Sequence, residues 1–133
     1  MNKRKGSPNP SQAEKQRVYV RDNGQCILQL DDGCTGRSEC TDHRAGRGSG
    51  GSRVLNHGAN LIGACRHCNG AKENATDEAR DELIRRGVRV IQDSTNEKTL
   101  ARAKATPVIY PDGEEYILID SSTRVLRKDW TPF

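Results

Sequence analysis

Apolar and aromatic residues are scarce in this chain of 133 residues. Hydrophobic residues make up 32% of it and aromatic residues 4%, which is below the usual content of a globular domain. The length suits one compact domain, but its hydrophobic core would be thin, so a further constraint such as a bound metal is needed. No apolar run is long enough to span a bilayer, and none follows Met1 that could serve as a signal peptide. We therefore expect a cytoplasmic protein without a membrane partner.

Cysteines are the candidates for that constraint, because paired cysteines in a reducing compartment are more often metal ligands than disulfide partners. Two of them form a C-x2-C knuckle that can reach one zinc ion. The other two ligands must come from the three cysteines upstream, of which Cys40 is the expected spare because it lies in a strand. We predict a structural Zn²⁺ site with four thiolate ligands, which leaves no position open for a substrate. Its predicted ligands are Cys26, Cys34, Cys65 and Cys68.

Basic residues are concentrated in the half of the chain that contains the cysteines. Residues 1–75 hold 12 of the 22 Lys and Arg but only 7 of the 18 Asp and Glu. A polyanion such as nucleic acid is a plausible partner for this half. Three of the charges lie in residues 3–5, and the polar, proline-containing residues 1–10 are predicted to form a disordered basic tail.

Capping and turn signals predict a small α+β domain. Ser11 and Glu14 form a capping box, and Gly24 lies where a helix would stop, so a helix is expected from about Gln12 to Asp22. Tyr110–Gly113 is a strong turn signal between two apolar, β-like runs and predicts a β-hairpin. The remaining expected elements are a strand leading into Asp42-His43, a strand at 60–64, a helical turn or more from Asn69, a helix at about 76–86 that stops at Gly87, and a continuation of the hairpin at 123–126.

The order of polar residues around the knuckle is specific. Asp42-His43 is followed by the glycine-rich loop 44–58, then by Asn60-Leu61, and then by Cys65-x2-Cys68-Asn69 with Lys72. This string resembles the HNH nuclease family, in the variant whose third motif residue is asparagine. The resemblance covers roughly residues 16–74, including the segment 21–26 that leads into the first cysteine, and the rest of the chain lies outside it.

The resemblance implies an α+β fold: a small zinc-stapled ββα-metal (HNH or His-Me finger) core with an N-terminal helix and a C-terminal β-hairpin. It implies one catalytic Mg²⁺ or Mn²⁺, held by Asp42 and Asn69. His43 would be the general base, and Asn60 would hold the loop and orient the ring of His43. An imidazole can accept a proton from water near neutral pH, and oxygen-bearing side chains suit a hard cation. Glu73, on the same helix face as Asn69, is an alternative metal ligand, and His67 is an alternative zinc ligand.

Phosphate contacts are expected from cations near the loop and from the helix that follows it. Arg44, Arg47 and Arg53 flank or lie within the glycine-rich loop, and Lys72 lies about one turn beyond Asn69. Such contacts would position a nucleic acid without reading its sequence.

The predicted organisation is a tail (1–10), an HNH core with its zinc site (11–75), and a C-terminal helix plus β-hairpin (76–133). We predict a divalent-metal-dependent DNA endonuclease that nicks or cuts both strands, in a phage or bacterial setting such as genome packaging or DNA processing. A non-catalytic zinc module that binds nucleic acid is the alternative, and a redox protein that uses Cys65 and Cys68 is a third hypothesis. The exposed edge of the hairpin could bind a protein partner or a second copy of the chain.

Overall fold

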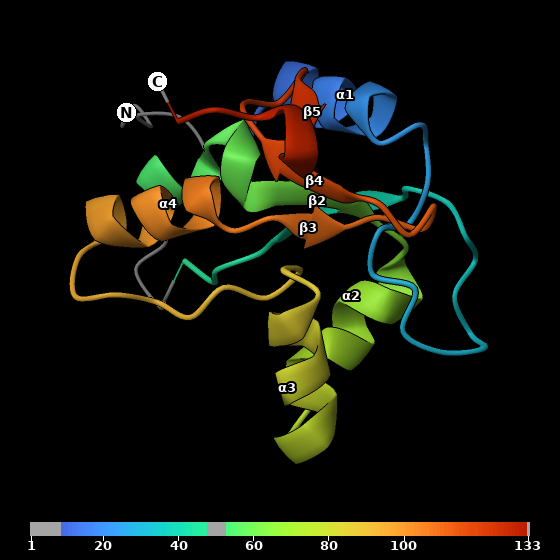
Figure 1. Ribbon diagram of the computed structural model, residues 1–133. Helices are drawn as coiled ribbons and strands as arrows, with labels where there is room; N and C mark the ends of the chain where they lie inside the picture. The colour runs from blue at the N-terminus through green and yellow to red at the C-terminus, as the bar shows by residue number, and fades with distance from the viewer. Residues whose placement is uncertain (1–8, 48–52, 133) are drawn as a thin grey trace, which may run out of the picture.

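The structure is a computed structural model that describes residues 9–47 and 53–132 (Figure 1). Within these residues the chain forms four α-helices and two small antiparallel sheets, so the predicted α+β class is confirmed. Most of the tail predicted for residues 1–10 lies outside the described residues.

The first helix forms where its capping signals placed it. α1 spans Gln12–Arg21, and the Ser11 hydroxyl accepts a hydrogen bond of 3.1 Å from the backbone N–H of Glu14. The helix ends one residue earlier than predicted, and Gly24 follows with φ +68°. Glycine adopts this left-handed conformation without steric cost, so the stop signal acts as expected.

Two strands and a helix follow in the order strand, strand, helix. β1 (Cys40–His43) pairs antiparallel with β2 (Leu61–Ala64), so that His43 lies opposite Leu61. The short 3-10 helices η1 (Val54–Asn56) and η2 (Gly58–Asn60) lie between the two strands in the sequence. α2 spans Arg66–Glu73 and begins three residues before the predicted start at Asn69, because Cys65 caps it by accepting a hydrogen bond from the N–H of Cys68.

The C-terminal half adds two helices and a second sheet. α3 (Asp77–Arg85) agrees with the prediction, whereas α4 (Asn96–Ala105) was not predicted. The second sheet has the order β3-β4-β5 and contains the predicted hairpin and its continuation; a short 3-10 helix, η3 (Arg127–Asp129), follows it. Its strands are β3 (Val108–Ile109), β4 (Glu115–Leu118) and β5 (Arg124–Leu126).

Both halves of the chain contribute to one core. α1 packs on β1 and β2, and α4 packs on η1, η2 and β4. Leu83, Val108 and Leu118 from the C-terminal half share a buried cluster with Ile27 and Ile62 from the cysteine-containing half. The described residues of the segment 76–132 are therefore packed into the same core as those of the cysteine-containing half.

Arg44 joins these two halves. Its side chain is fully buried, and its guanidinium donates four hydrogen bonds of 2.7–2.8 Å to backbone carbonyls. The accepting oxygens belong to Ala59, Gly87, Ala103 and Thr106. Burial lowers the pKa of Arg44 to about 9, so the group remains charged at neutral pH. The prediction that Arg44 contacts phosphate is wrong, because the guanidinium is enclosed and already occupied.

A second buried pair acts in the same way. Arg21 and Asp22 form an ion pair with a distance of 2.8 Å between Nε and Oδ1. Arg21 Nη1 also donates to the carbonyls of Gly58 and Asp120, both at 2.9 Å. Asp22 accepts a hydrogen bond of 2.5 Å from the hydroxyl of Tyr110. This pair therefore ties the end of α1 to η2 and to the C-terminal sheet.

The role of Arg44 can be tested by replacing it with a side chain of similar size. We expect Arg44→Met to lower the free energy of unfolding by about 4 kcal/mol, because buried carbonyls lose their donor. Urea unfolding followed by circular dichroism measures this change. Arg17→Met removes an exposed ion pair with Glu14 and should unfold like the wild type. Equal stability of the two variants would contradict the role given to Arg44.

Candidate functional site

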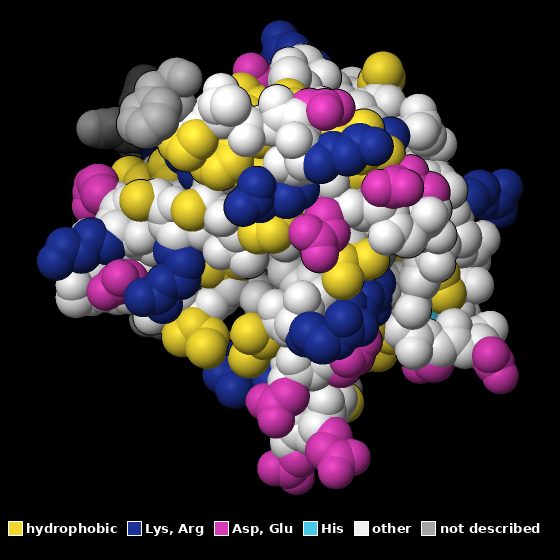
Figure 2. All heavy atoms as spheres, viewed as in Figure 1, with side chains coloured by type: hydrophobic (Ala, Val, Ile, Leu, Met, Phe, Trp, Pro, Cys, Tyr) yellow, Lys and Arg dark blue, Asp and Glu magenta, His cyan; other side chains and the backbone are white. Residues whose placement is uncertain are grey.

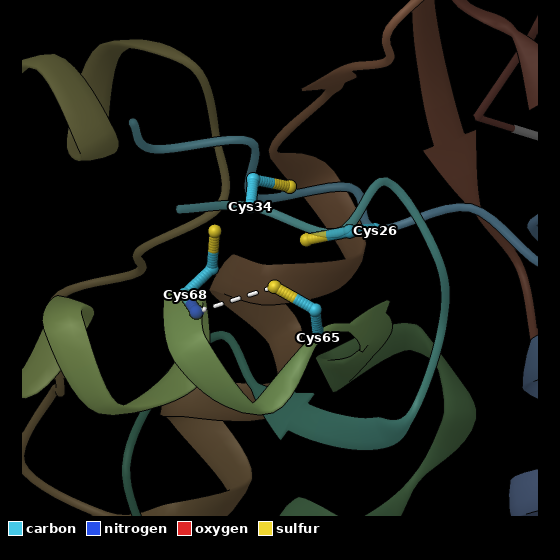
Figure 3. Close-up of side chains that lie close together, drawn as sticks. All are labelled: Cys26, Cys34, Cys65 and Cys68. Atoms are coloured by element: carbon cyan, nitrogen blue, oxygen red, sulfur yellow. Dashed lines mark hydrogen bonds between the residues drawn. The ribbon is translucent and has the colours of Figure 1, made fainter. Parts of the chain in front are cut away.

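Four cysteines from two separate parts of the chain meet in one cluster. Their sulfur atoms all lie within 4.8 Å of one another, and three of the four residues are buried. Figure 3 shows the four side chains turned toward a common centre, two from the loop after α1 and two from the start of α2. The cluster consists of Cys26, Cys34, Cys65 and Cys68, the set expected from the sequence. Cys40 lies outside it.

The chemistry of these ligands fits a zinc ion. A tetrahedral zinc with bonds of about 2.3 Å places its sulfurs about 3.8 Å apart, which a cluster with all its sulfurs within 4.8 Å can accommodate. Backbone N–H groups of Leu30, Gly36 and Cys68 donate to sulfur atoms of the cluster at 3.3 Å each. Burial opposes ionisation of Cys65, but hydrogen bonds from backbone amides outweigh it and lower its pKa to about 6. The cluster can therefore hold a metal such as zinc.

His67 is not a member of the cluster, although it lies between two of its cysteines. Its Nε2 lies 2.6 Å from Asp31 Oδ1, and both side chains are about half exposed. The His67 ring is thus engaged with Asp31 at the surface and is not part of the buried cysteine cluster. The alternative in which His67 replaces a cysteine as zinc ligand is therefore not supported.

His43 ends β1 with one ring nitrogen held in place. Its Nε2 lies 2.8 Å from the side-chain oxygen of Asn56. An amide oxygen can only accept, so Nε2 carries the proton and Nδ1 keeps a lone pair. Burial lowers the pKa of His43, the hydrogen bond with Asn56 opposes this, and the charges of Arg47 and Lys72 lower it further, so the site favours the neutral ring. These are the properties that a general base needs.

Asn60 holds the loop rather than the ring. Its side chain is fully buried and makes hydrogen bonds of 2.9–3.0 Å with both backbone groups of Ala45 and with the carbonyl of Leu55. It therefore closes the loop that separates the two strands. The prediction that Asn60 orients the ring of His43 is wrong, because Asn56 makes that contact.

Asp42 and Lys72 form a buried ion pair beside His43. The distance between Lys72 Nζ and Asp42 Oδ2 is 2.6 Å, and Nζ also donates to the carbonyls of His43 and Val88. Burial raises the pKa of Asp42, and the charge of Lys72 opposes that rise. The prediction that Lys72 contacts a flanking phosphate is wrong for this structure, because all three of its hydrogens are engaged.

Asn69 lies on the same side of β1 as Asp42. Its amide nitrogen is 3.4 Å from the sulfur of Cys40, and Cys40 and Asp42 share a strand face because they are two residues apart. One oxygen of Asp42 and the amide oxygen of Asn69 accept no hydrogen bond from the described residues. These two oxygens are the donors that would suit a hard cation.

A cleft of about 270 Å³ opens next to His43. Five charged residues line it besides His43: the buried Arg44 and Lys72, together with Glu73, Arg80 and Arg89. Glu73 is exposed on the last turn of α2, and both arginines come from the C-terminal half, outside the segment with the HNH resemblance. Neither arginine was predicted, since both lie far from the motif in sequence.

The remaining two predicted phosphate contacts lie at the ends of a segment outside the described residues, 48–52. Arg47 Nη2 lies 3.1 Å from the side-chain oxygen of Asn9. Arg53 is exposed and lines a different pocket with His57 and Asp120. The structure thus does not bring Arg47 or Arg53 into the lining of the His43 cleft.

Models of known protein families, curated proteins and solved structures were all compared with this chain, and none of them matches it. No helix in the described part of the chain combines the length and the apolar character needed to cross a membrane.

Loss of the metal should unfold the cysteine-containing half. We expect the purified protein to carry one equivalent of zinc, and chelation to abolish its cooperative thermal transition, because binding at a four-thiolate site supplies folding free energy. Metal analysis and circular dichroism measure the two effects. Cys65→Ser should lose zinc, whereas the matched control Cys40→Ser should retain it. Zinc retention by Cys65→Ser would contradict the assignment.

The two asparagines should differ in what they stabilise. We expect Asn60→Ala to lower the free energy of unfolding by about 3 kcal/mol, because buried backbone groups lose their partners. Asn56→Ala should cost less than about 1 kcal/mol, because Asn56 is only partly buried. Urea unfolding of both variants checks this order, and the reverse order would show that Asn60 does not hold the loop.

Proposed function

We propose that the chain is a divalent-metal-dependent DNA endonuclease of the HNH type. The observation that carries the proposal is the state of His43: its ring is neutral, held through Nε2 by Asn56, and placed at a cleft lined with cations. The order of β1, β2 and α2, with the cysteine cluster at the start of α2, supports a ββα-metal core.

His43 would act as the general base. Nδ1 takes a proton from water, the water oxygen forms a bond to phosphorus, and the bond from phosphorus to the leaving oxygen breaks. The leaving oxygen then takes a proton from solvent. A positioned base of this kind contributes about 10²- to 10⁴-fold to a rate. Asn56 serves as a positioning residue, because it sets which nitrogen of His43 faces the water.

Asp42 and Asn69 would hold the catalytic cation through their oxygens. When bound, Mg²⁺ or Mn²⁺ withdraws charge from the phosphate and favours attack on it. Asp42 keeps one oxygen for this purpose while Lys72 neutralises the other. Glu73 lies on the turn after Asn69 and lines the cleft, so it is a third oxygen donor within reach of the same region.

A non-catalytic zinc module that binds nucleic acid would also use the cysteine cluster and the basic cleft. Such a module has no need for a half-buried neutral histidine whose tautomer is fixed by a neighbouring amide. This feature favours catalysis. A redox role for Cys65 and Cys68 is less well supported, because they meet two further cysteines instead of standing as a pair.

Two parts of the proposal rest on the sequence resemblance and on sheet geometry. The phage or bacterial setting, such as genome packaging or DNA processing, follows from the HNH resemblance. The open edges of the sheet β3-β4-β5 are the places where a partner strand or a second copy could pair.

A plasmid-nicking assay tests the endonuclease function. The wild type should convert supercoiled DNA when Mg²⁺ or Mn²⁺ is added, and His43→Ala should lower the rate at least about 100-fold. His67→Ala is the matched control, because His67 is exposed and lies outside the cleft. Zinc content should be equal in all three proteins.

The same assay separates the two functions. A wild type that binds the plasmid but leaves it intact with both metals would favour the binding module. Cleavage that persists at the wild-type rate in His43→Ala would remove His43 from the role of base.

A further inference from the structure

Two arginines of the C-terminal half line the His43 cleft. Arg80 lies on α3, and Arg89 follows the glycine that ends that helix. Both side chains are partly exposed, and neither guanidinium makes a hydrogen bond or ion pair with residues 9–47 or 53–132. Each therefore presents a cation and several donors to whatever enters the cleft.

Other arginines of the C-terminal half are committed within the protein. One pairs with a carboxylate on its own helix, one pairs with a carboxylate before α4, one donates to a backbone carbonyl, and one stacks on tyrosine rings. In this order they are Arg85, Arg102, Arg86 and Arg124. A further arginine, Arg127, lies with its guanidinium carbon 5.8 Å from the centre of the Trp130 ring. Unlike these arginines, Arg80 and Arg89 have guanidinium groups that are available to bind a ligand in the cleft.

The surrounding charges restrict where an anion can bind. Acidic side chains gather at the projecting end of α3, where Asp77 and Glu78 form the first turn (Figure 2). They repel an anion from that end and leave the cleft beside His43 as the favourable place. Arg89 is close enough to Asp42 for its charge to act on that carboxylate. An anion held by Arg89 would therefore lie near the reacting groups.

We propose that Arg80 and Arg89 bind backbone phosphates that flank the phosphodiester bond cleaved with the help of His43. The substrate in this proposal rests on the proposed endonuclease function. A guanidinium matches a phosphate through two parallel N–H donors. Phosphate contacts position DNA without reading its sequence, so these arginines supply affinity that does not depend on sequence. In this proposal the phosphate contacts come from α3 and the segment after it, instead of from Arg44 and Lys72.

Binding measured without cleavage tests the proposal. The His43→Ala protein is titrated against a short fluorescent DNA duplex at several salt concentrations, with fluorescence anisotropy as the readout. Arg80→Gln and Arg89→Gln in this background should each weaken binding about tenfold. The double variant should lower the slope of log affinity against log salt by about 1.8, since each lost phosphate contact removes about 0.9. Duplexes of unrelated sequence should show the same losses.

Arg85→Gln is the matched control, because Arg85 lies on the same helix but is exposed and paired with Glu82. Its affinity and salt slope should equal those of the background protein. Thermal unfolding should be nearly unchanged in the Arg80 and Arg89 variants, because neither guanidinium makes a hydrogen bond or ion pair with residues 9–47 or 53–132.

The outcomes separate this proposal from the endonuclease function. A double variant that binds DNA with the affinity and salt slope of the control overturns the proposal, and so does a background protein that binds duplex RNA but not DNA. If the arginine variants lose binding while the wild type fails to nick plasmid with Mg²⁺ or Mn²⁺, the phosphate contacts stand and the nuclease function falls. Plasmid nicking at the wild-type rate by a protein that carries Arg80→Gln and Arg89→Gln but keeps His43 overturns the contacts and leaves the nuclease function in place.

Discussion

Four sulfur atoms within 4.8 Å of one another are the constraint on which the rest of the structure depends. The chain has few apolar residues, and three of its five cysteines are themselves members of the main buried cluster. Thiolates at this separation repel one another unless a cation lies between them, so a metal ion would stabilise the cluster. Zinc bound there would supply folding free energy that adds to the small contribution of the thin apolar core.

The cluster also sets how α2 faces the first sheet. Cys65 caps α2 and Cys68 lies on its first turn, so the cysteine cluster fixes the rotation of the helix about its axis. With this rotation, Asn69 meets the thiol of Cys40 and Lys72 meets the carboxylate of Asp42, one turn further along. Lys72 also binds the carbonyl of His43 and so fixes the backbone at the end of β1. The cysteine cluster thereby fixes the geometry of a site that it does not touch.

Helices and turns that depend on a few neighbouring residues could be predicted from the sequence. A cap at Ser11, a stop at Gly87 and the turn at Tyr110–Gly113 each act within a few residues, and the elements they predicted are present. The four cysteines of the cluster could be predicted for the same reason. The C-x2-C spacing identified two of them, and the position of Cys40 in an expected strand excluded it from the set. α4 has a comparable cap at Thr95, whose side chain accepts from Lys98, and this signal was missed.

The partners of the polar side chains could not be predicted in this way. Asn56 and Asn60 stand four residues apart in one loop, and only the fold of that loop decides which of them reaches His43. The burial of Arg44 could not be predicted for a similar reason. Arginine is rarely buried, and the four carbonyls that accept its hydrogen bonds lie far along the chain, between residues 59 and 106. Its rigid fork of donors satisfies carbonyls at or near the ends of η2, α3 and α4 at once. Consequently His43 stands between two buried charged residues, Asp42 and Arg44, each of which is fixed by the protein. The backbone of the proposed base is held on both sides, and such support keeps a catalytic group in place before the substrate arrives.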